Sequence, residues 1–167
     1  MGRKRHGARV LLAVAALVLF EVGGAAGVAS AGSRTQAGGS VSAVADVSTH
    51  QFTVSIGGQV VRVMPASMGK PGHETPLGTF HVMEKFRDMV MDSSTYGVPV
   101  DAPEGYRLYV EYAVRLTSGG IFVHGAPWSV DSQGYENVSH GCINLSTENA
   151  AWFFENVEVG DPVTVVG

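Results

Sequence analysis

The sequence predicts a mainly β domain with one minor helix. Short runs of alternating apolar and polar residues recur along the chain, 22 of its 167 residues are glycine, and helical periodicity occurs only near the C-terminus. Alternation with a period of two is typical of strands that bury one face. Glycine-rich connections between such runs favour tight turns. Together these features favour a β fold in which the helix is a secondary element.

Residues 1–31 are expected to be a secretory signal peptide. Four basic residues lie among residues 3–9, an apolar run of 11 residues covers 10–20, and Ala29-Ser30-Ala31 follows. Basic, apolar and A-x-A segments in this order are typical of a signal peptide. The run is shorter than the roughly 20 residues that a helix needs to span a bilayer. We therefore expect export without a stable membrane span after cleavage, with an uncleaved anchor as the alternative.

The remaining chain is acidic. Without residues 1–31 it has 7 basic and 14 acidic residues, a net charge near -7 with neutral histidines. Nucleic-acid binding needs clustered Lys and Arg, so the composition argues against that partner. Residues 32–40 are rich in Gly, Ser and Thr and are predicted to be a short linker. Residues 41–167 have a suitable length for one domain with its own core.

The first strands form the clearest pattern. A weak strand is predicted over 41–47, and apolar and polar residues then alternate over 52–56. Gly57-Gly58 follows, and the chain returns as a second strand over 60–64. Two glycines between such runs indicate a hairpin, because glycine adopts positive φ at both central turn positions at little cost.

The middle of the chain is harder to assign. Prolines and glycines predict a loop over 68–78, and a strand is predicted over 79–83. Its histidines, His73 and His81, are interpreted as solvated or packed side chains. Residues 86–111 are less regular and contain several aromatic residues. They are either a mobile lid over a site or a long surface loop with ordinary packing, and the sequence leaves both open.

The last third is predicted as a strand, a loop, a helix and a strand. Residues 121–124 resemble a buried strand, 125–137 a loop and 163–166 a final strand. Ser146 can cap a helix, and Glu148 lies in its first turn, where the helix dipole favours negative charge. Its apolar face repeats at i, i+3, i+4 and i+7, through Ala150, Phe153, Phe154 and Val157.

Cys142 is the only cysteine and cannot form an intramolecular disulfide. A lone thiol in an exported protein is either an intermolecular bridge partner or a reactive group. Ser139, His140 and Gly141 precede it, and these residues are typical of tight, hydrogen-bonded turns. His124 ends an apolar strand upstream. Since a histidine can remove the proton of a thiol, Cys142 and His124 are predicted to be a nucleophile and its base.

These residues resemble a known catalytic family. His124, fourteen residues, and then Ser139-His140-Gly141-Cys142-Ile143-Asn144 are similar to the motif of the L,D-transpeptidase (YkuD-type) catalytic domain. The similarity covers roughly 41–167 and points to the actinobacterial branch, on the flanking blocks 91–99, 122–124, 126–130 and 149–153. The resemblance implies a β-sandwich or barrel-like catalytic domain without metal or cofactor.

The resemblance also implies a two-step acyl transfer that forms 3→3 cross-links in peptidoglycan. Cys142 would attack the carbonyl of the third residue, a diaminopimelate, of a donor tetrapeptide stem and release the terminal D-Ala. The side-chain amine of a diaminopimelate on an acceptor stem would then resolve the thioester. Carbapenems, β-lactams with a strained carbonyl, are expected to acylate the same thiol.

Each site residue has an expected role. His124 is the base, oriented by the carbonyl of Gly125, and backbone N–H groups around His140, Gly141 and Cys142 would hold the oxyanion. Ser139 is expected to fix the loop. His140 supports the thiol, or is itself the base in a competing assignment. The substrate-binding residues implied by the resemblance are Met91, Tyr106, Gly119, Gly120, Trp128 and Asn144.

Three alternatives remain from the sequence. A metal-binding module could use His124, His140 and Cys142 as zinc ligands, although no C-x-x-C pair accompanies them. The domain could be a catalytically silent wall-binding module. It could also be an L,D-carboxypeptidase or cysteine peptidase, in which water replaces the acceptor amine. The first half-reaction is shared, so the sequence does not separate hydrolysis from transfer.

Overall fold

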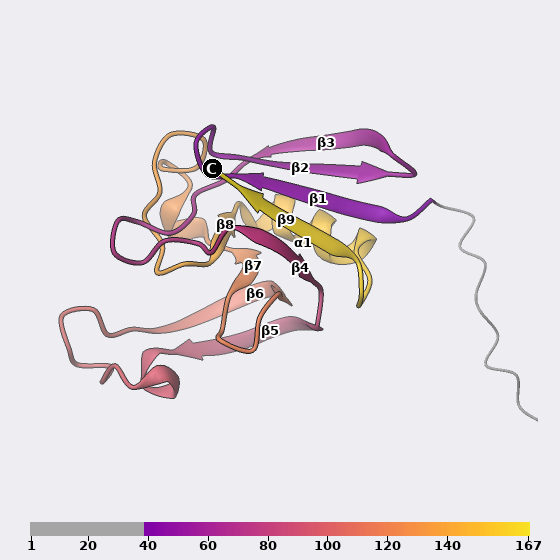
Figure 1. Cartoon of the computed structure of the whole chain (residues 1–167). Coiled ribbons are helices and arrows are strands. Elements are labelled where there is room, and N and C mark those ends of the chain that lie inside the picture. Colours follow the sequence, from indigo (N-terminus) through magenta and orange to yellow (C-terminus); the bar gives the residue numbers. More distant parts are fainter. Residues whose placement is uncertain (1–38) are drawn as a thin grey trace, which may run out of the picture. The chain divides into compact units, whose positions relative to one another are not determined.

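The computed structural model describes residues 39–167, which form two β-sheets and one α-helix (Figure 1). The predicted fold class, mainly β with a minor helix, is confirmed. The predicted signal peptide, 1–31, and most of the predicted linker, 32–40, lie outside the described residues and stay predictions. Within residues 39–167, no helix is long and apolar enough to cross a membrane.

The first sheet has five strands in the order β3-β2-β1-β9-β4. Strands β1 and β9 pair in parallel, and the other neighbours are antiparallel. The predicted hairpin is confirmed, since Gly57 and Gly58 both have positive φ, 59° and 78°, at the turn between β2 and β3. The strands are β1 (Val41–Asp46), β2 (Gln51–Ile56), β3 (Gln59–Pro65), β4 (Gly78–His81) and β9 (Pro162–Val166).

The second sheet has four strands in the order β5-β6-β7-β8. They are β5 (Glu84–Asp92), β6 (Arg107–Arg115), β7 (Phe122–Gly125) and β8 (Ile143–Leu145). The expectation of irregular chain over 86–111 is wrong for both ends of that range, where β5 and β6 form a long antiparallel pair. Most residues of β5 are exposed or half-buried, so no clear alternation marks it in the sequence. Only the segment 93–106, with the 3-10 turn η1 (Ser93–Tyr96), interrupts the pair.

Strand β8 was not predicted, because three residues carry no periodicity of their own. It pairs in parallel with β7, and the chain between them holds a second 3-10 turn, η2 (Pro127–Ser129). Because the two strands run in the same direction, this connection leaves the end of β7 and returns to the start of β8, beside the start of β7. The residues just before β8 therefore lie next to the residues of β7.

Helix α1 (Thr147–Asn156) lies against the second sheet and contacts β6, β7 and β8. The Ser146 side chain caps it by accepting a hydrogen bond from the N–H of Asn149, as predicted. Phe153 is fully buried and meets the edge of Phe52 on β2, with ring centroids 4.9 Å apart. The helix thereby joins the two sheets in one hydrophobic core.

The Phe52–Phe153 contact predicts a large stability effect. Phe153→Ala should lower the free energy of unfolding by about 3–5 kcal/mol, because it removes a buried ring and leaves a cavity. Urea denaturation followed by circular dichroism measures it. Tyr135→Ala is the control, since Tyr135 is 82% exposed and should change stability by no more than about 0.5 kcal/mol. Equal effects of the two substitutions would contradict a core shared through α1.

Candidate active site

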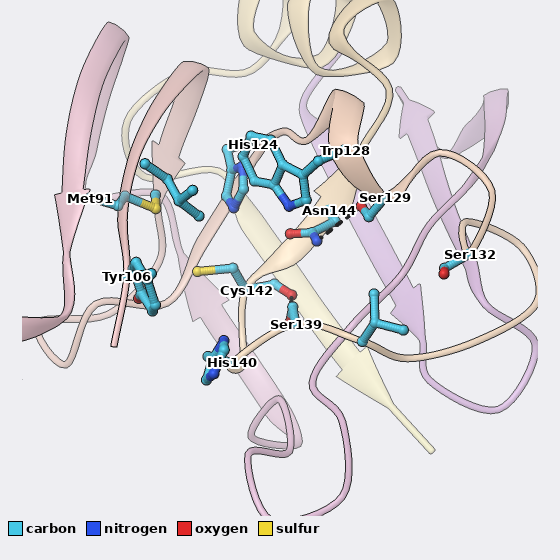
Figure 2. A pocket seen from close by; sticks show the side chains of 12 residues that line it. Met91, Tyr106, His124, Trp128, Ser129, Ser132, Ser139, His140, Cys142 and Asn144 are labelled. Atoms are coloured by element: carbon cyan, nitrogen blue, oxygen red, sulfur yellow. Dashed lines mark hydrogen bonds between the residues drawn. The ribbon is translucent and has the colours of Figure 1, made fainter. Parts of the chain in front are cut away.

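The parallel pairing of β7 with β8 brings the predicted base and nucleophile together. His124 is in register with Asn144, and Val123 with Ile143. Because side chains alternate across a strand, His124 and Asn144 share one face, while Val123 and Ile143 point into the core. Cys142 lies two residues before Asn144 and faces the same side. Figure 2 shows the imidazole, the thiol and the amide on one wall of a cavity.

This cavity has a volume of about 310 Å³. Strands β5 to β8, η2, the connection from η2 to β8 and the end of the segment 93–106 line it, and eight of the predicted site residues are among the lining. The lining residues are Met91, Tyr106, Leu108, His124, Trp128, Ser129, Ser132, Val138, Ser139, His140, Cys142 and Asn144.

The predicted glycine pair lies in a second cavity. Gly119 and Gly120 line a space of about 510 Å³ that shares Met91 and Tyr106 with the first. The carbonyl of Gly120 accepts a hydrogen bond from the Cys142 thiol, with Sγ and O 3.6 Å apart. The predicted substrate-binding residues are thus divided between two neighbouring cavities, and Cys142, which lines the first, donates to a residue of the second.

His124 is buried and oriented. His124 is only 3% exposed, and its Nδ1 lies 2.9 Å from the carbonyl oxygen of Gly125. A carbonyl only accepts, so this contact assigns the ring proton to Nδ1 and leaves Nε2 with a lone pair. Burial lowers the pKa of His124 to about 4, against a smaller opposite effect of the Gly125 hydrogen bond. The imidazole is therefore a neutral base near pH 7.

Cys142 is half-buried, and its thiol is also neutral at rest. Burial raises the pKa of the Cys142 thiol to about 11, although a hydrogen bond from the Phe122 backbone acts in the other direction. A thiolate and an imidazolium would both lose solvation in this cavity. Both pKa shifts therefore favour the neutral thiol and the neutral imidazole near pH 7.

The loop before Cys142 is held tightly. Ser139 Oγ accepts from the N–H of Gly141 at 3.0 Å and donates to the carbonyl of Cys142 at 2.6 Å. The buried Thr75 hydroxyl donates to the carbonyl of Gly141 at 2.8 Å. Gly141 has φ 114°, and a Cβ there would lie 2.9 Å from a methyl carbon of Ile121. Only glycine fits this position. The Gly141 N–H, expected to hold an oxyanion, is bonded to Ser139 in this structure.

Asn144 is fixed by residues that the sequence did not single out. Its Nδ2 donates to Ser129 Oγ at 3.2 Å, and Ser129 in turn donates to the carbonyl of Ala126 at 3.2 Å. Gln133 also donates to that carbonyl. Both supporting side chains are buried. In the sequence, Ser129 and Gln133 are typical of an exposed surface loop. Only their burial in the structure shows that they support Asn144. Trp128, 51% exposed, stands beside His124 with ring centroids 5.9 Å apart.

His140 lies at the rim of the cavity. Its Nε2 is 2.7 Å from Glu104 Oε2, and its ring is 5.3 Å from that of Tyr106 between centroids. Lys70 Nζ lies 2.7 Å from the same oxygen. Lys70 and then His140 hold the pKa of Glu104 down, to about 2. Lys70 and Glu104 were not predicted site residues, because 34 residues separate them in the chain.

The zinc set considered from the sequence does not assemble. Among the described residues, the one group of potential metal ligands is His73, Glu104 and His140, without His124 or Cys142. His73 was interpreted from the sequence as a solvated or packed side chain. Its ring meets that of His140 with centroids 4.8 Å apart. No sequence pattern links these three residues, which come from three separate segments.

Comparisons with known proteins agree with this geometry. Residues 40–165 match the family model YkuD, described as the L,D-transpeptidase catalytic domain. The chain is 58% identical over 132 residues to L,D-transpeptidase 1 of Mycobacterium tuberculosis, covering 79% of this chain and 53% of that protein. It is 48% identical over 156 residues to the probable L,D-transpeptidase 3 of the same organism, covering 83% and 58%.

Solved structures give the same result. An L,D-transpeptidase in complex with imipenem has 59% sequence identity and a TM-score of 0.75, over 76% of this chain and 59% of that one. L,D-transpeptidase 3 from Mycobacterium tuberculosis, with a faropenem-derived adduct, has 51% identity and a TM-score of 0.74, over 77% and 60%. The chain thus spans between half and two thirds of these relatives. Its mycobacterial relatives confirm the predicted actinobacterial branch, and the chain belongs to the YkuD family of L,D-transpeptidase catalytic domains.

Proposed function

We propose that this protein is an L,D-transpeptidase that forms 3→3 cross-links between peptidoglycan stem peptides through a thioester on Cys142. One observation carries the proposal: the Cys142 thiol, just before β8, and the oriented His124 imidazole, on β7, face the same cavity. The family membership supports it. We also propose export to the cell wall, which rests on the basic, apolar and A-x-A pattern of residues 1–31.

The first half-reaction uses the two neutral groups. The thiol donates to Gly120 in this structure, so the proposed proton transfer requires Sγ to leave that carbonyl and turn toward His124 Nε2. Sγ attacks the carbonyl carbon of the donor diaminopimelate while Nε2 takes the thiol proton. The C–N bond to the terminal D-Ala then breaks, and His124 returns the proton to the leaving amine. The product is a thioester on Cys142 and free D-Ala.

The second half-reaction reverses these roles. The acceptor amine attacks the thioester carbon and gives its proton to His124 Nε2. The C–S bond breaks, and Sγ regains a proton from the imidazole. The Nδ1–H bond to Gly125 keeps the ring in one orientation through both steps. A ring that could turn would lose the alignment with Sγ.

Backbone N–H groups next to the thiol stabilise the negative oxygen of both tetrahedral intermediates. Because the Gly141 N–H is bonded to Ser139, we assign this role to the N–H groups of His140 and Cys142. Asn144 binds the stem peptide with its amide oxygen, since its Nδ2 is held by Ser129. Met91, Tyr106 and Trp128 provide the apolar surface around it.

β-Lactams are proposed as covalent inhibitors. A related L,D-transpeptidase has been solved in complex with imipenem, and another with a faropenem-derived adduct. The ring carbonyl of a carbapenem is an acyl donor for the same thiol, and ring opening breaks its C–N bond. The acceptor half of the site is then not needed, so an acyl adduct is expected to accumulate on Cys142.

The muropeptide products distinguish transfer from hydrolysis. Incubation with disaccharide tetrapeptides should yield 3→3 cross-linked dimers and free D-Ala, because the acceptor amine outcompetes water at the thioester. Mass spectrometry measures the products, and Cys142→Ser is the control without the thiol. Tripeptide monomers without dimers would instead support the L,D-carboxypeptidase alternative. If neither the wild type nor Cys142→Ser gave any product, the result would support the alternative of a catalytically silent wall-binding module.

The identity of the base is tested by substitution. His124→Ala should slow the acylation of Cys142 by imipenem about 10²–10⁴-fold, the usual contribution of a positioned general base. Intact-mass spectrometry over time measures the rate. His140→Ala is the matched variant. It should slow acylation less, because the Nε2 of His140 is bound to Glu104 and is not available as a base. Loss of acylation in His140→Ala with a normal rate in His124→Ala would reverse the assignment.

The pKa directions predict the pH dependence. The pKa of His124 is lowered to about 4, so the base stays neutral where an exposed histidine, with a pKa of about 6.5, would be protonated. The acylation rate should be nearly flat from about pH 5 to pH 9 and fall as the pH drops through about 4. Stopped-flow measurement with imipenem follows the rate, and circular dichroism verifies folding at each pH. A rate that rises tenfold per pH unit near neutrality would point to attack by a free thiolate.

A further inference from the structure

We propose that His73, Glu104 and His140 form a binding site for a divalent metal ion of the zinc type at the rim of the catalytic cavity. Their ligand atoms all lie within 4.8 Å of one another. Two imidazoles and one carboxylate are a common ligand set for Zn²⁺, and a fourth position is left for water. The site excludes Cys142 and goes beyond the proposed reaction, which uses no metal.

The distances are close to those that a bound ion requires. Zinc binds nitrogen and oxygen ligands at about 2.0–2.2 Å, so two ligand atoms on one tetrahedral ion lie roughly 3.5 Å apart. Glu104 Oε2 is 2.7 Å from His140 Nε2 and 3.9 Å from His73 Nε2. The first distance must lengthen and the second shorten, each by less than about 1 Å, and the two imidazole nitrogens, within 4.8 Å of each other, must also approach. All three residues are half-buried or exposed, so the side chains can make this adjustment.

Buried hydrogen bonds place the two histidines opposite each other. The backbone of Lys70 donates to the carbonyl of Ser139, beside His140, at 3.0 Å. Thr75 Oγ1 accepts from the N–H of Gly69 at 2.9 Å and donates to the carbonyl of Gly141 at 2.8 Å. The loop that carries His73 is thus fastened to the loop that carries His140. Two of the three ligands are arranged before an ion arrives, which lowers the entropy lost on binding.

Lys70 competes with the metal for Glu104. Its Nζ lies 2.7 Å from Glu104 Oε2, the oxygen that also faces both histidines. An ammonium ion cannot use the imidazole lone pairs, whereas a divalent ion binds them and the carboxylate together. Binding therefore replaces Lys70 at Glu104 and moves its charge away. Removing that charge should strengthen metal binding, which is the opposite of the effect of removing a ligand.

The three ligands belong to three segments around the cavity. His73 lies in the loop between β3 and β4, Glu104 in the segment 93–106 between β5 and β6, and His140 two residues before Cys142. Tyr106, two residues after Glu104, lines both cavities. A bound ion ties the segment 93–106 to the loop of the nucleophile. Its occupancy therefore restrains one side of the entrance without contact to the thiol.

The test uses the Cys142→Ala protein, because the thiol is itself a metal ligand. Titration with ZnCl₂ by isothermal calorimetry should give one ion per chain. His73→Ala in this background should weaken binding at least tenfold, and Glu104→Gln should weaken it as well. His81→Ala is the matched control, since His81 is an exposed histidine outside the cluster. Lys70→Met should strengthen binding.

Cobalt provides a second measurement on the same proteins. Co²⁺ in the Cys142→Ala protein should give visible absorption that His73→Ala abolishes, and circular dichroism shows that each variant is folded. Equal zinc affinities in His73→Ala and His81→Ala overturn the proposal, as does the absence of stoichiometric binding in the Cys142→Ala parent. Cys142→Ala has no nucleophile, so these outcomes are independent of whether the protein is a transpeptidase.

Discussion

The parallel pairing of β7 with the three-residue strand β8 is the constraint on which the site depends. It places His124 in register with Asn144 and turns Cys142 to the same face. The pairing is held from the other side as well, since the backbones of Ser67 and Asn144 exchange two hydrogen bonds, at 2.8 and 3.1 Å. Alternate residues of the same two strands, Val123 and Ile143 among them, are fully buried in the core shared with α1. A shift of one residue would turn the side chains of His124, Cys142 and Asn144 toward that core.

Burial sets the chemistry of the two central groups. The cavity removes solvent from both His124 and Cys142, so each favours its neutral form. The hydrogen bond from Nδ1 to the Gly125 carbonyl then determines which ring nitrogen faces the thiol. In the reaction proposed above, the thiol would therefore be activated by proton transfer during attack, not by a permanent charge. The tightly bonded turn from Ser139 to Cys142 fixes the position of the sulfur-bearing backbone, and the side-chain rotation of Cys142 remains as the adjustable part.

The entrance to the cavity is built from segments that are distant in sequence. Glu104 from the β5–β6 connection meets Lys70 and His140 at its rim, and Tyr106 from the same connection contacts the His140 ring. Charged and aromatic side chains thus link this connection to the loop that carries His140 and Cys142. These contacts are partly exposed, so solvent screens them and each contributes little to stability. Their effect is on position, because they hold the end of the segment 93–106, with Tyr106, beside His140 at the cavity.

Local patterns in the sequence predict the fold class, the β2–β3 hairpin, the capped helix and the residues expected to perform the chemistry. Each prediction depends on local features: alternation, Gly57-Gly58, Ser146 before an apolar face, and a lone cysteine after Ser139-His140-Gly141. Four features appear only when the chain is folded: the β5–β6 pair, the β7–β8 register, the support of Asn144 by Ser129 and Gln133, and the cluster of His73, Glu104 and His140. These features are pairings between distant segments, and a one-dimensional pattern carries no information on which loops meet. The shared core and the backbone hydrogen bonds between loops determine which segments lie in contact.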